Sequence, residues 1–192
     1  MIAKNNELHR YKDLNFGFVI IAPECNFGNI NCTVRSIKKN YPGVQCICVV
    51  SNNISSEGIK ELNEICLTYK GKDTITSLIN TGIKKGCKEW NLIVMEGVSV
   101  RPHLNKKYSL YIESDKDVLF PIVMEYNREG IPTRIRNSFE DATLNGTFIH
   151  QKMFKVSGDF ADAPISYSKF MWAICAHDNG AKFKAILGAQ LL

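Results

Sequence analysis

Short, almost fully apolar segments alternate with segments of helical periodicity over the first hundred residues. Apolar runs occupy residues 17–22, 44–50 and 92–95, and a further short strand is expected at 66–69. Between the runs, apolar residues recur every three or four positions, which predicts helices over 29–40, from a cap at Ser55 or Ser56 onward, and over 74–85. Strands that alternate with helices indicate a parallel sheet, and strands covered by helices on both faces read as continuous apolar runs.

The pattern changes after residue 100. Residues 101–117 are polar and irregular, and 118–126 read as a strand interrupted by Pro121, hence an edge strand or a bulge. A charged loop region is expected at 127–143, followed by a strand at 144–149, a helix at 166–179 and a last strand at 182–187. We therefore expect one α/β domain over 1–192, with a polar leader (1–15), a regularly wound half (17–100) and a mixed half (101–192).

Composition supports an ordinary globular domain and limits its partners. The 192 residues are 45% hydrophobic and 22% charged, enough apolar material for a full core. The formal charge of +5 is scattered, and its densest spots are lysine pairs, so the charge pattern argues against a nucleic-acid partner and suits a small anionic ligand such as a sugar diphosphate.

The cysteines and the chain start predict a cytoplasmic location. None of the seven cysteines forms a C-x-x-C pair, and Cys46 and Cys48 are expected to point together from a strand into the core. The four histidines lack zinc-ligand spacing. The polar N-terminus has no signal-peptide core, and no apolar run reaches the roughly 18 residues that span a bilayer.

Polar side chains follow the predicted strands at one edge of the sheet. In an open α/β sheet, ligands bind beyond the carboxyl ends of the strands, which here are followed by residues 23–29, 51–56, 73–80 and 96–101. The first two segments are rich in Asn, Ser and Gly, which suit a base or a ribose. The same residues dominate turns, so composition alone leaves binding and a plain loop equally open.

Four sequence motifs, taken in chain order, resemble those of glycosyltransferase family 2, whose fold is named GT-A. FVIIAPECN resembles the first strand of that family with its Pro-x-x-Asn, and VVSNNISS resembles its second-strand motif. NTGIKKGCKEWNLIVMEG resembles the Asn-x-Gly helix that leads into the metal-binding strand, and LNGTFIHQKMFKVSGDFAD resembles a later strand, helix and Gly-Gly-Phe-Asp stretch. The resemblance covers about residues 17–187. It implies a GT-A-like three-layer α/β/α sandwich with a mostly parallel mixed sheet. It also implies that the protein binds a nucleotide-diphospho-sugar.

The resemblance and the strand-end loops together define candidate binding residues. The candidates for nucleotide-sugar binding are Pro23, Glu24, Asn26, Ser51, Asn52, Asn80, Gly82 and Arg101. Ser51 or Asn52 stands where the family has an aspartate that contacts the nucleotide base. At the Asp-x-Asp motif, Glu96 aligns with the first aspartate and Val98 with the second, so Glu96 is the candidate ligand for a divalent cation, Mn²⁺ or Mg²⁺. Ser99 or Glu125 is a candidate substitute for the second ligand.

The catalytic base of the family is an acid near the start of the late helix, where residues 164–168 hold no carboxylate. Asp162 is the candidate base, with a role in a turn as its alternative. The first hypothesis is an inverting glycosyltransferase that acts on an unspecified acceptor. The alternative is a catalytically inactive binding or structural protein on the same fold. A third, nucleotidyltransferase-like reading expects a basic first loop, but residues 23–29 contain no Lys or Arg.

Overall fold

A computed structural model describes residues 15–86, 88–102, 108, 111, 115–140 and 142–186. The predicted leader, apart from Asn15, lies outside this part of the chain. In the first half the elements are β1 (Phe16–Ala22), α2 (Phe27–Asn40), β2 (Gln45–Ser51), α3 (Ser56–Ile65), β3 (Leu67–Gly71), α4 (Ile75–Lys85) and β4 (Trp90–Met95). In the second half they are β5 (Val118–Pro121), β6 (Val123–Tyr126), β7 (Pro132–Arg136), β8 (Phe148–His150), α6 (Lys152–Ser157), α7 (Ile165–Asp178) and β9 (Phe183–Ile186).

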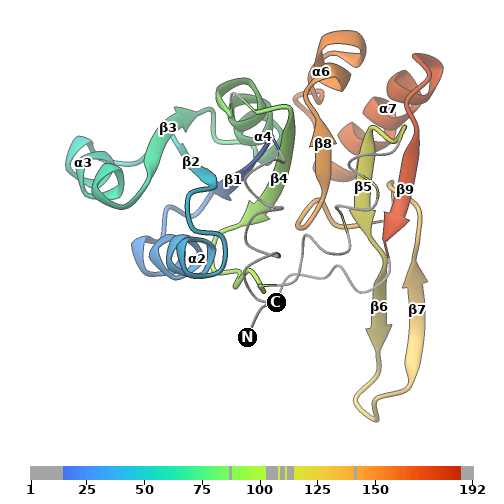
Figure 1. The fold of residues 1–192 in the computed structure, drawn as a ribbon, viewed down its shortest axis with the longest axis horizontal. Coiled ribbons are helices and arrows are strands. Elements are labelled where there is room, and N and C mark those ends of the chain that lie inside the picture. The colour runs from blue at the N-terminus through green and yellow to red at the C-terminus, as the bar shows by residue number, and fades with distance from the viewer. Residues whose placement is uncertain are drawn as a thin grey trace, which may run out of the picture.

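The main sheet has seven strands in the order β3-β2-β1-β4-β8-β5-β9 (Figure 1). Strands β1 to β4 are parallel to one another, as are β5 and β9, while β8 runs antiparallel to both of its neighbours. The expected mostly parallel mixed sheet is therefore confirmed. β8 inserts between β4 and β5, so strands from both halves of the chain belong to one sheet.

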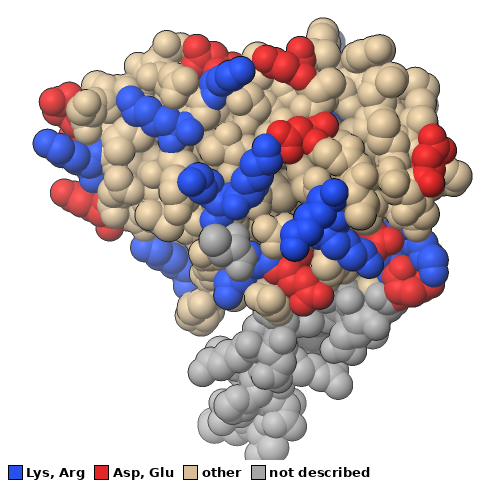
Figure 2. Space-filling view, turned by 90° about the horizontal axis from the view of Figure 1, so that it is seen from above, with Lys and Arg blue, Asp and Glu red and all other residues tan. Residues whose placement is uncertain are grey.

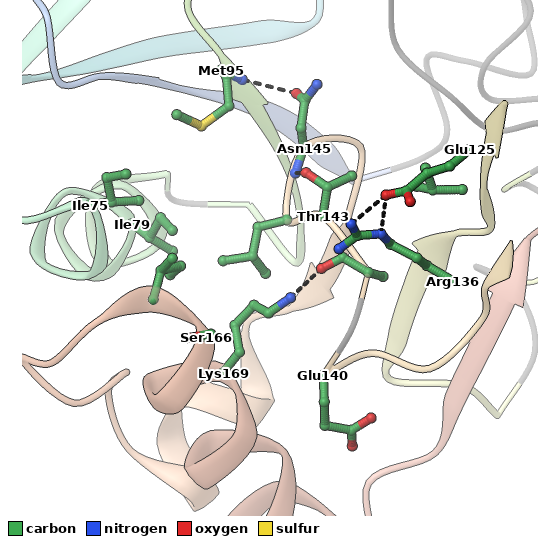
Figure 3. Close-up of a pocket in the computed structure, with 14 residues that line it drawn as sticks. Ile75, Ile79, Met95, Glu125, Arg136, Glu140, Thr143, Asn145, Ser166 and Lys169 are labelled. Atoms are coloured by element: carbon green, nitrogen blue, oxygen red, sulfur yellow. Dashed lines mark hydrogen bonds and ion pairs between the residues drawn. The ribbon is translucent and has the colours of Figure 1, made fainter. Parts of the chain in front are cut away.

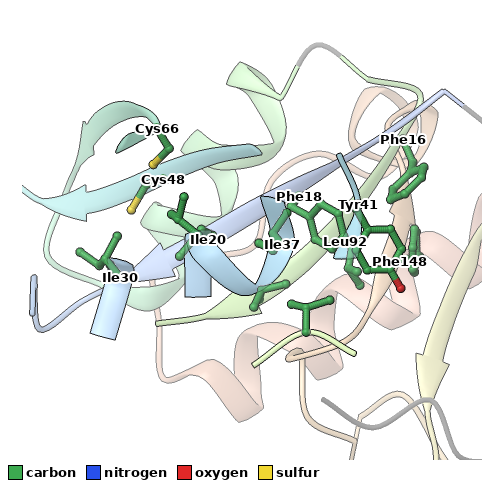
Figure 4. Close-up of a cluster of buried hydrophobic side chains, with 14 of the residues drawn as sticks. Phe16, Phe18, Ile20, Ile30, Ile37, Tyr41, Cys48, Cys66, Leu92 and Phe148 are labelled. Carbon is green, nitrogen blue, oxygen red and sulfur yellow. The ribbon is translucent and has the colours of Figure 1, made fainter. Parts of the chain in front are cut away.

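Helices cover the sheet on both faces, which explains the solid apolar runs. On β1, Phe18 and Ile20 pack with α2 and α3 in one buried cluster, which includes Cys48 and Cys66 (Figure 4). The alternate residues Val19 and Ile21 pack with α4 and α7 in a second cluster. Because successive side chains point to opposite faces, a strand buried on both sides has no solvent-facing position for a polar residue.

The helices of the first half begin directly after the strand-end loops, at side-chain caps. Asn26, Ser55 and Thr74 each accept a hydrogen bond from the backbone N–H three residues on, at 3.0, 3.0 and 3.3 Å. Such caps satisfy donors that a helix start leaves open. Ser55, rather than Ser56, caps α3, and α2 starts two residues earlier than predicted, because Asn26 is its cap.

The segment around Pro121 differs from the prediction. β5 is an interior strand between β8 and β9, not an edge. Ile122 N donates toward β9, to Ile186 O at 3.0 Å, so the missing N–H of Pro121 faces the β8 side, where pairing ends at Leu119. A proline is tolerated there because no ladder hydrogen bond is lost.

Residues predicted as one strand and one loop form a separate hairpin. β6 pairs antiparallel with β7, and this two-stranded ribbon extends beyond the main sheet (Figure 1). The expected loop over 127–143 thus contains strand β7. Most β6 and β7 side chains are exposed or half-buried, so a buried apolar run does not mark these strands.

Basic and acidic side chains are mixed on the surface. Lys, Arg, Asp and Glu side chains lie intermixed on the face drawn in Figure 2. Among the described residues, no helix combines the length and the apolarity needed to cross a membrane.

Candidate functional site

The carboxyl ends of β1, β2, β3 and β4 meet at one edge of the sheet, and hydrogen bonds connect the loops that follow them. We call this edge the rim and define it by residues 23–26, 51–54, 73–74 and 96–97. At its centre, the half-buried carboxylate of Glu96 accepts hydrogen bonds from Glu24 N at 2.8 Å and Asn26 N at 3.0 Å. Burial raises the pKa of Glu96, although these two hydrogen bonds oppose the shift. Glu96 therefore ties the end of β4 to the β1–α2 loop.

A second carboxylate joins the loops after β2 and β3. Ser51 Oγ donates to Asp73 Oδ1, and Asn52 N donates to the same oxygen at 3.2 Å. Cys25, whose φ of 55° lies in the left-handed region, stands near both carboxylates. Burial raises the pKa of its thiol, and the negative charges of Glu96 and Asp73 raise it further. Side chains from all four loops thus converge within one polar region.

Most of the predicted binding residues gather at this rim. Pro23 and Glu24 lie in the β1–α2 loop, and Asn26 caps α2 there. Ser51 and Asn52 contact Asp73, which sequence reasoning placed only within a loop segment. Arg101 follows the rim after β4, with an exposed side chain and a carbonyl that accepts from Tyr41 OH at 2.7 Å.

Asn80 and Gly82 lie elsewhere, in the interface between α4 and its neighbours. The Asn80 amide donates to Phe160 O at 2.8 Å and accepts from Phe160 N at 2.9 Å. A Cβ on Gly82 would stand 2.2 Å from Val19 Cγ1, so this glycine lets α4 approach β1 closely. Both residues therefore have packing roles.

A cleft of about 530 Å³ adjoins the rim (Figure 3). α4, α7, the end of β4 and the hairpin surround it, and its main apolar walls are Ile75, Ile79, Met95, Leu144 and Ile165. Asn145 accepts from Met95 N at 3.0 Å and so fixes the segment before β8 against the end of β4. The rim and the cleft meet at the start of α4, where Thr74 of the rim and Ile75 of the cleft wall line one smaller recess.

Charged side chains border the cleft. Arg136 Nε donates to Glu125 Oε1 at 2.6 Å across the hairpin, as Figure 3 shows. Lys169 of α7 is only 6% exposed and donates to Ala142 O. Of the charged residues that line the cleft, sequence reasoning named Glu125, placed Arg136 and Glu140 only within the charged loop over 127–143, and missed Lys169. For Lys169 a signal existed: it is the single lysine of α7, whose other charged residue, Asp178, stands at the very end of the helix, and lysine is rarely buried without a partner.

Asp162, the predicted base, lies beside the cleft and not in its wall. Its Oδ1 accepts from Thr74 Oγ1 at 2.8 Å, in a smaller recess of about 390 Å³. That recess shares Ile75 and Ile165 with the cleft. Among the described residues, the acids that line the cleft itself are Glu125 and Glu140.

The described residues alone do not complete a site for a divalent cation. Hydrogen bonds from backbone amides engage both carboxylate oxygens of Glu96, and Val98 offers no ligand atom. Across the described part of the chain, no three or more His, Cys, Asp or Glu side chains are grouped to hold a metal ion. We therefore derive no step through a cation.

Comparison with known proteins identifies the fold. No family model matches the sequence, and no curated protein matches it. Among solved structures, residues 1–349 of TarS from S. aureus superpose with a TM-score of 0.61 at 14% identity, over 92% of this chain and 58% of that one. The same protein in complex with UDP gives a TM-score of 0.63.

Two further solved structures, both of other enzymes, also match this chain. Glucosyl-3-phosphoglycerate synthase from M. tuberculosis matches with a TM-score of 0.63 at 10% identity, over 95% of this chain and 74% of that one. 4-Diphosphocytidyl-2C-methyl-D-erythritol synthase from Anaerococcus prevotii matches with a TM-score of 0.55 at 13% identity, over 94% of this chain and 91% of that one. The chain has the GT-A-like fold of nucleotide-diphospho-sugar transferases. It spans little more than half of the TarS chain that it matches.

Proposed function

We propose that this protein binds a nucleotide-diphospho-sugar, with the nucleoside at the rim and the sugar in the adjoining cleft. The observation that carries the proposal is that the rim and the cleft meet at Thr74 and Ile75, beside the carboxyl ends of parallel strands. A solved structure of the same fold, TarS, contains UDP, and other neighbours are named as sugar or nucleotidyl transferases.

Charge at the cleft supports the anionic part of the ligand. Arg136 of the hairpin, paired with Glu125, and Lys169 of α7 both line the cleft, and both are cations of a kind that binds a diphosphate. The N-terminus of α4 at Ile75 also borders it, and helix N-termini favour negative charge.

For the reaction, we propose transfer of the sugar with inversion to an acceptor hydroxyl. Asp162 takes the proton of that hydroxyl, the acceptor oxygen bonds to the anomeric carbon, and the bond from that carbon to the diphosphate breaks. The nucleoside diphosphate leaves with the bonding electrons. Asp162 is exposed next to the cleft, so an acceptor that enters along Ile75 and Ile165 reaches its carboxylate.

A specific observation favours the alternative, a catalytically inactive protein that binds the same ligand. No carboxylate occupies the start of α7, Val98 replaces a ligand position, and Glu96 is engaged by the β1–α2 loop. On this alternative the rim and cleft hold a nucleotide sugar without turnover.

Thermal-shift titration with UDP- and GDP-sugars, with and without Mn²⁺, tests binding. A ligand at a hundred times its Kd stabilises a fold by about 2.7 kcal/mol, so we expect a clear rise in Tm. A rise that needs Mn²⁺ and disappears in Glu96→Ala supports a cation at Glu96, whereas a rise that ignores Mn²⁺ supports a metal-independent site. The absence of any shift with every nucleotide sugar would contradict the proposal.

Release of nucleoside diphosphate distinguishes the enzyme from the inactive protein. We expect Asp162→Asn to bind the sugar nucleotide like wild type and to lower release at least about a hundredfold, in the range of general-base contributions. Asp159→Asn is the matched control, because that carboxylate pairs with Lys84 at 2.5 Å. Binding without release in the wild type would favour the inactive alternative.

A further inference from the structure

Three cysteine side chains meet on one face of the sheet, toward the end of β2 that is remote from the rim. In the parallel register Ile47 of β2 lies opposite Leu67 of β3. Cys66 directly precedes Leu67 and has an extended backbone, with φ −159° and ψ 157°, so it stands opposite Cys46. Cys48 points to the same face of β2 as Cys46, because side chains alternate along a strand. The Cys66 thiol shares hydrogen bonds with both of the other thiols, and Figure 4 shows it with Cys48.

The spacing of the backbone selects Cys46 as the partner with which Cys66 can form a disulfide. Neighbouring strands lie about 4.8 Å apart, within the separation of about 4.4–6.8 Å between Cα atoms that a disulfide bridges. Cys48 is displaced along β2 by two residues, about 6.6 Å, so its Cα lies about 8 Å from that of Cys66, beyond this range. All three cysteines are free thiols in the structure.

The surroundings of the three thiols favour oxidation at Cys66. Hydrogen bonds from the Cys46 and Cys48 thiols lower the pKa of Cys66, and the positive charge of Lys38 lowers it further. Lys38 Nζ is held beside Cys66 by a hydrogen bond to Ile65 O at 2.5 Å. Cys66 is 8% exposed and Cys46 is half-buried, so the cluster opens to solvent at Cys46. A thiolate next to a cation, in a partly accessible place, is the kind of cysteine that small oxidants attack.

We infer that Cys46 and Cys66 are a redox modification site, which hydrogen peroxide converts to a disulfide and a thiol reductant restores. The Cys66 thiolate attacks one oxygen of the peroxide, the O–O bond breaks, and the released hydroxide takes the proton that Cys66 lost. The Cys46 sulfur then attacks the resulting sulfenic acid of Cys66, and the S–O bond breaks. The second hydroxide leaves as water with the proton of Cys46. In total, two thiols are oxidised to one disulfide and one peroxide is reduced to two waters.

The disulfide connects the edge of the sheet to its interior. β3 is the edge strand next to β2, and the bond closes a loop over 46–66 that contains α3 and the rim residues 51–54. Closing a loop of about 20 residues restricts mainly the unfolded chain, so the oxidised protein should be the more stable form. The inference does not rest on the proposed function.

Peptide mapping of the folded chain after exposure to hydrogen peroxide tests the inference. Once the remaining thiols are blocked with iodoacetamide, trypsin leaves Cys46 and Cys48 in peptide 40–60 and Cys66 in peptide 61–70, because it cuts after lysine. We expect the two peptides to appear joined, with the loss of two hydrogen atoms, and to separate after treatment with dithiothreitol. The Tm of the joined protein should rise by about 5 °C or more and return on reduction.

Variants identify the two sulfur atoms. Cys46→Ser and Cys66→Ser should each lose the joined peptides and the rise in Tm. Cys48→Ala is the matched control and should keep both, because it removes the neighbouring thiol that the backbone holds out of reach. The parent of all three variants carries Cys32→Ser and Cys175→Ser, so that exposed thiols do not link two chains. Circular dichroism confirms that each variant is folded before oxidation, and if Cys66→Ser does not fold, Cys46→Ser carries the test.

Several results would overturn the inference. The peptides could stay separate in the oxidised wild type, which would show that the two sulfur atoms do not react with each other. Joined peptides that persist in Cys46→Ser, or that disappear in Cys48→Ala, would make Cys48 the partner. If the chain unfolded in urea joins the same peptides as fast as the folded chain does, the fold does not direct the bond. None of these results bears on nucleotide binding.

Discussion

Glu96 shows how one residue can hold the β1–α2 loop in place and make its stability depend on pH. Its carboxylate bonds the backbone of Glu24 and Asn26, and burial raises its pKa. A carboxyl group with a raised pKa binds its proton more readily in the folded state than in the unfolded state. Its favourable contribution is therefore fully present below the unfolded pKa and declines as pH rises through the folded pKa.

Glu96→Gln removes this titration and provides the first test at the residue scale. The Tm of wild type minus that of Glu96→Gln should decrease as pH rises from about 4 to about 7, the interval above the ordinary glutamate pKa. Differential scanning fluorimetry across this range measures it. Glu61→Gln, at an exposed glutamate of α3, controls for the loss of one negative charge. A difference that stays constant with pH would contradict the assignment.

Gly82 tests close packing between helix and sheet. In Gly82→Ala the new Cβ would meet Val19 Cγ1 at 2.2 Å, so α4 or β1 must shift. We expect a loss of about 1–3 kcal/mol in the free energy of unfolding, typical of overpacking. Urea denaturation measures it, with Gly28→Ala as the control, since the nearest atom there, Asn26 Oδ1, is 3.3 Å away. Equal stability of wild type and Gly82→Ala would show that the contact is not tight.

At the scale of elements, Asn80 joins α4 to the segment that leads into α7. Its amide exchanges two hydrogen bonds with the backbone of Phe160, and Trp172 Nε1 of α7 donates to Gly158 O at 3.0 Å in the same segment. α4 and α7 both border the cleft, so this connection links two of the elements that form its walls.

Asn80→Ala separates a structural role from a ligand-binding role. Two backbone groups of Phe160 lose their partners, which should cost about 1–3 kcal/mol of unfolding free energy, measured by urea denaturation. The affinity of the folded variant for a nucleotide sugar should stay within about twofold of wild type, as no bound group is removed. Asn179→Ala, which removes only a bond to Cys175 O within α7, is the control. Weaker binding at unchanged stability would instead make Asn80 a ligand.

At the scale of the whole molecule, one sheet unites both halves of the chain. β8 lies between β4 and β5, and β1 to β4 alone would leave the backbone N–H and C=O groups along one edge of β4 unpaired. Trp90 at the start of β4 and Trp172 on α7 are both buried, one in each apolar cluster. Because each half completes the sheet of the other, we expect a single cooperative unit.

Single-tryptophan variants test this cooperativity. Trp90→Phe and Trp172→Phe each leave one fluorescent reporter, in different clusters. Their urea transitions should each coincide with the loss of helical circular dichroism in the same variant. Separate midpoints for fluorescence and circular dichroism in either variant would show that the two halves unfold independently.

Local sequence was sufficient to predict those elements that depend on residues close together along the chain. Buried runs located β1, β2 and β4, helical periodicity located α2, α3 and α4, and side chains able to cap a helix marked helix starts such as Ser55. The edge at which we propose ligand binding followed from the parallel order of the strands. The hairpin β6–β7 was not predicted. Its side chains are mostly exposed, so its sequence lacks the apolar run by which a buried strand is recognised.

Contacts between distant residues were decided only by the tertiary structure. Sequence order predicted Glu96, Ser51 and Asn52 near a ligand, but not that Glu96 would bond the β1–α2 loop or that Asp73 would stand beside Ser51. It also did not predict that Asn80 would bind Phe160 or that Lys169 would be buried. The physical reason is that periodicity and capping depend on neighbours along the chain, whereas these contacts depend on how strands are ordered in the sheet.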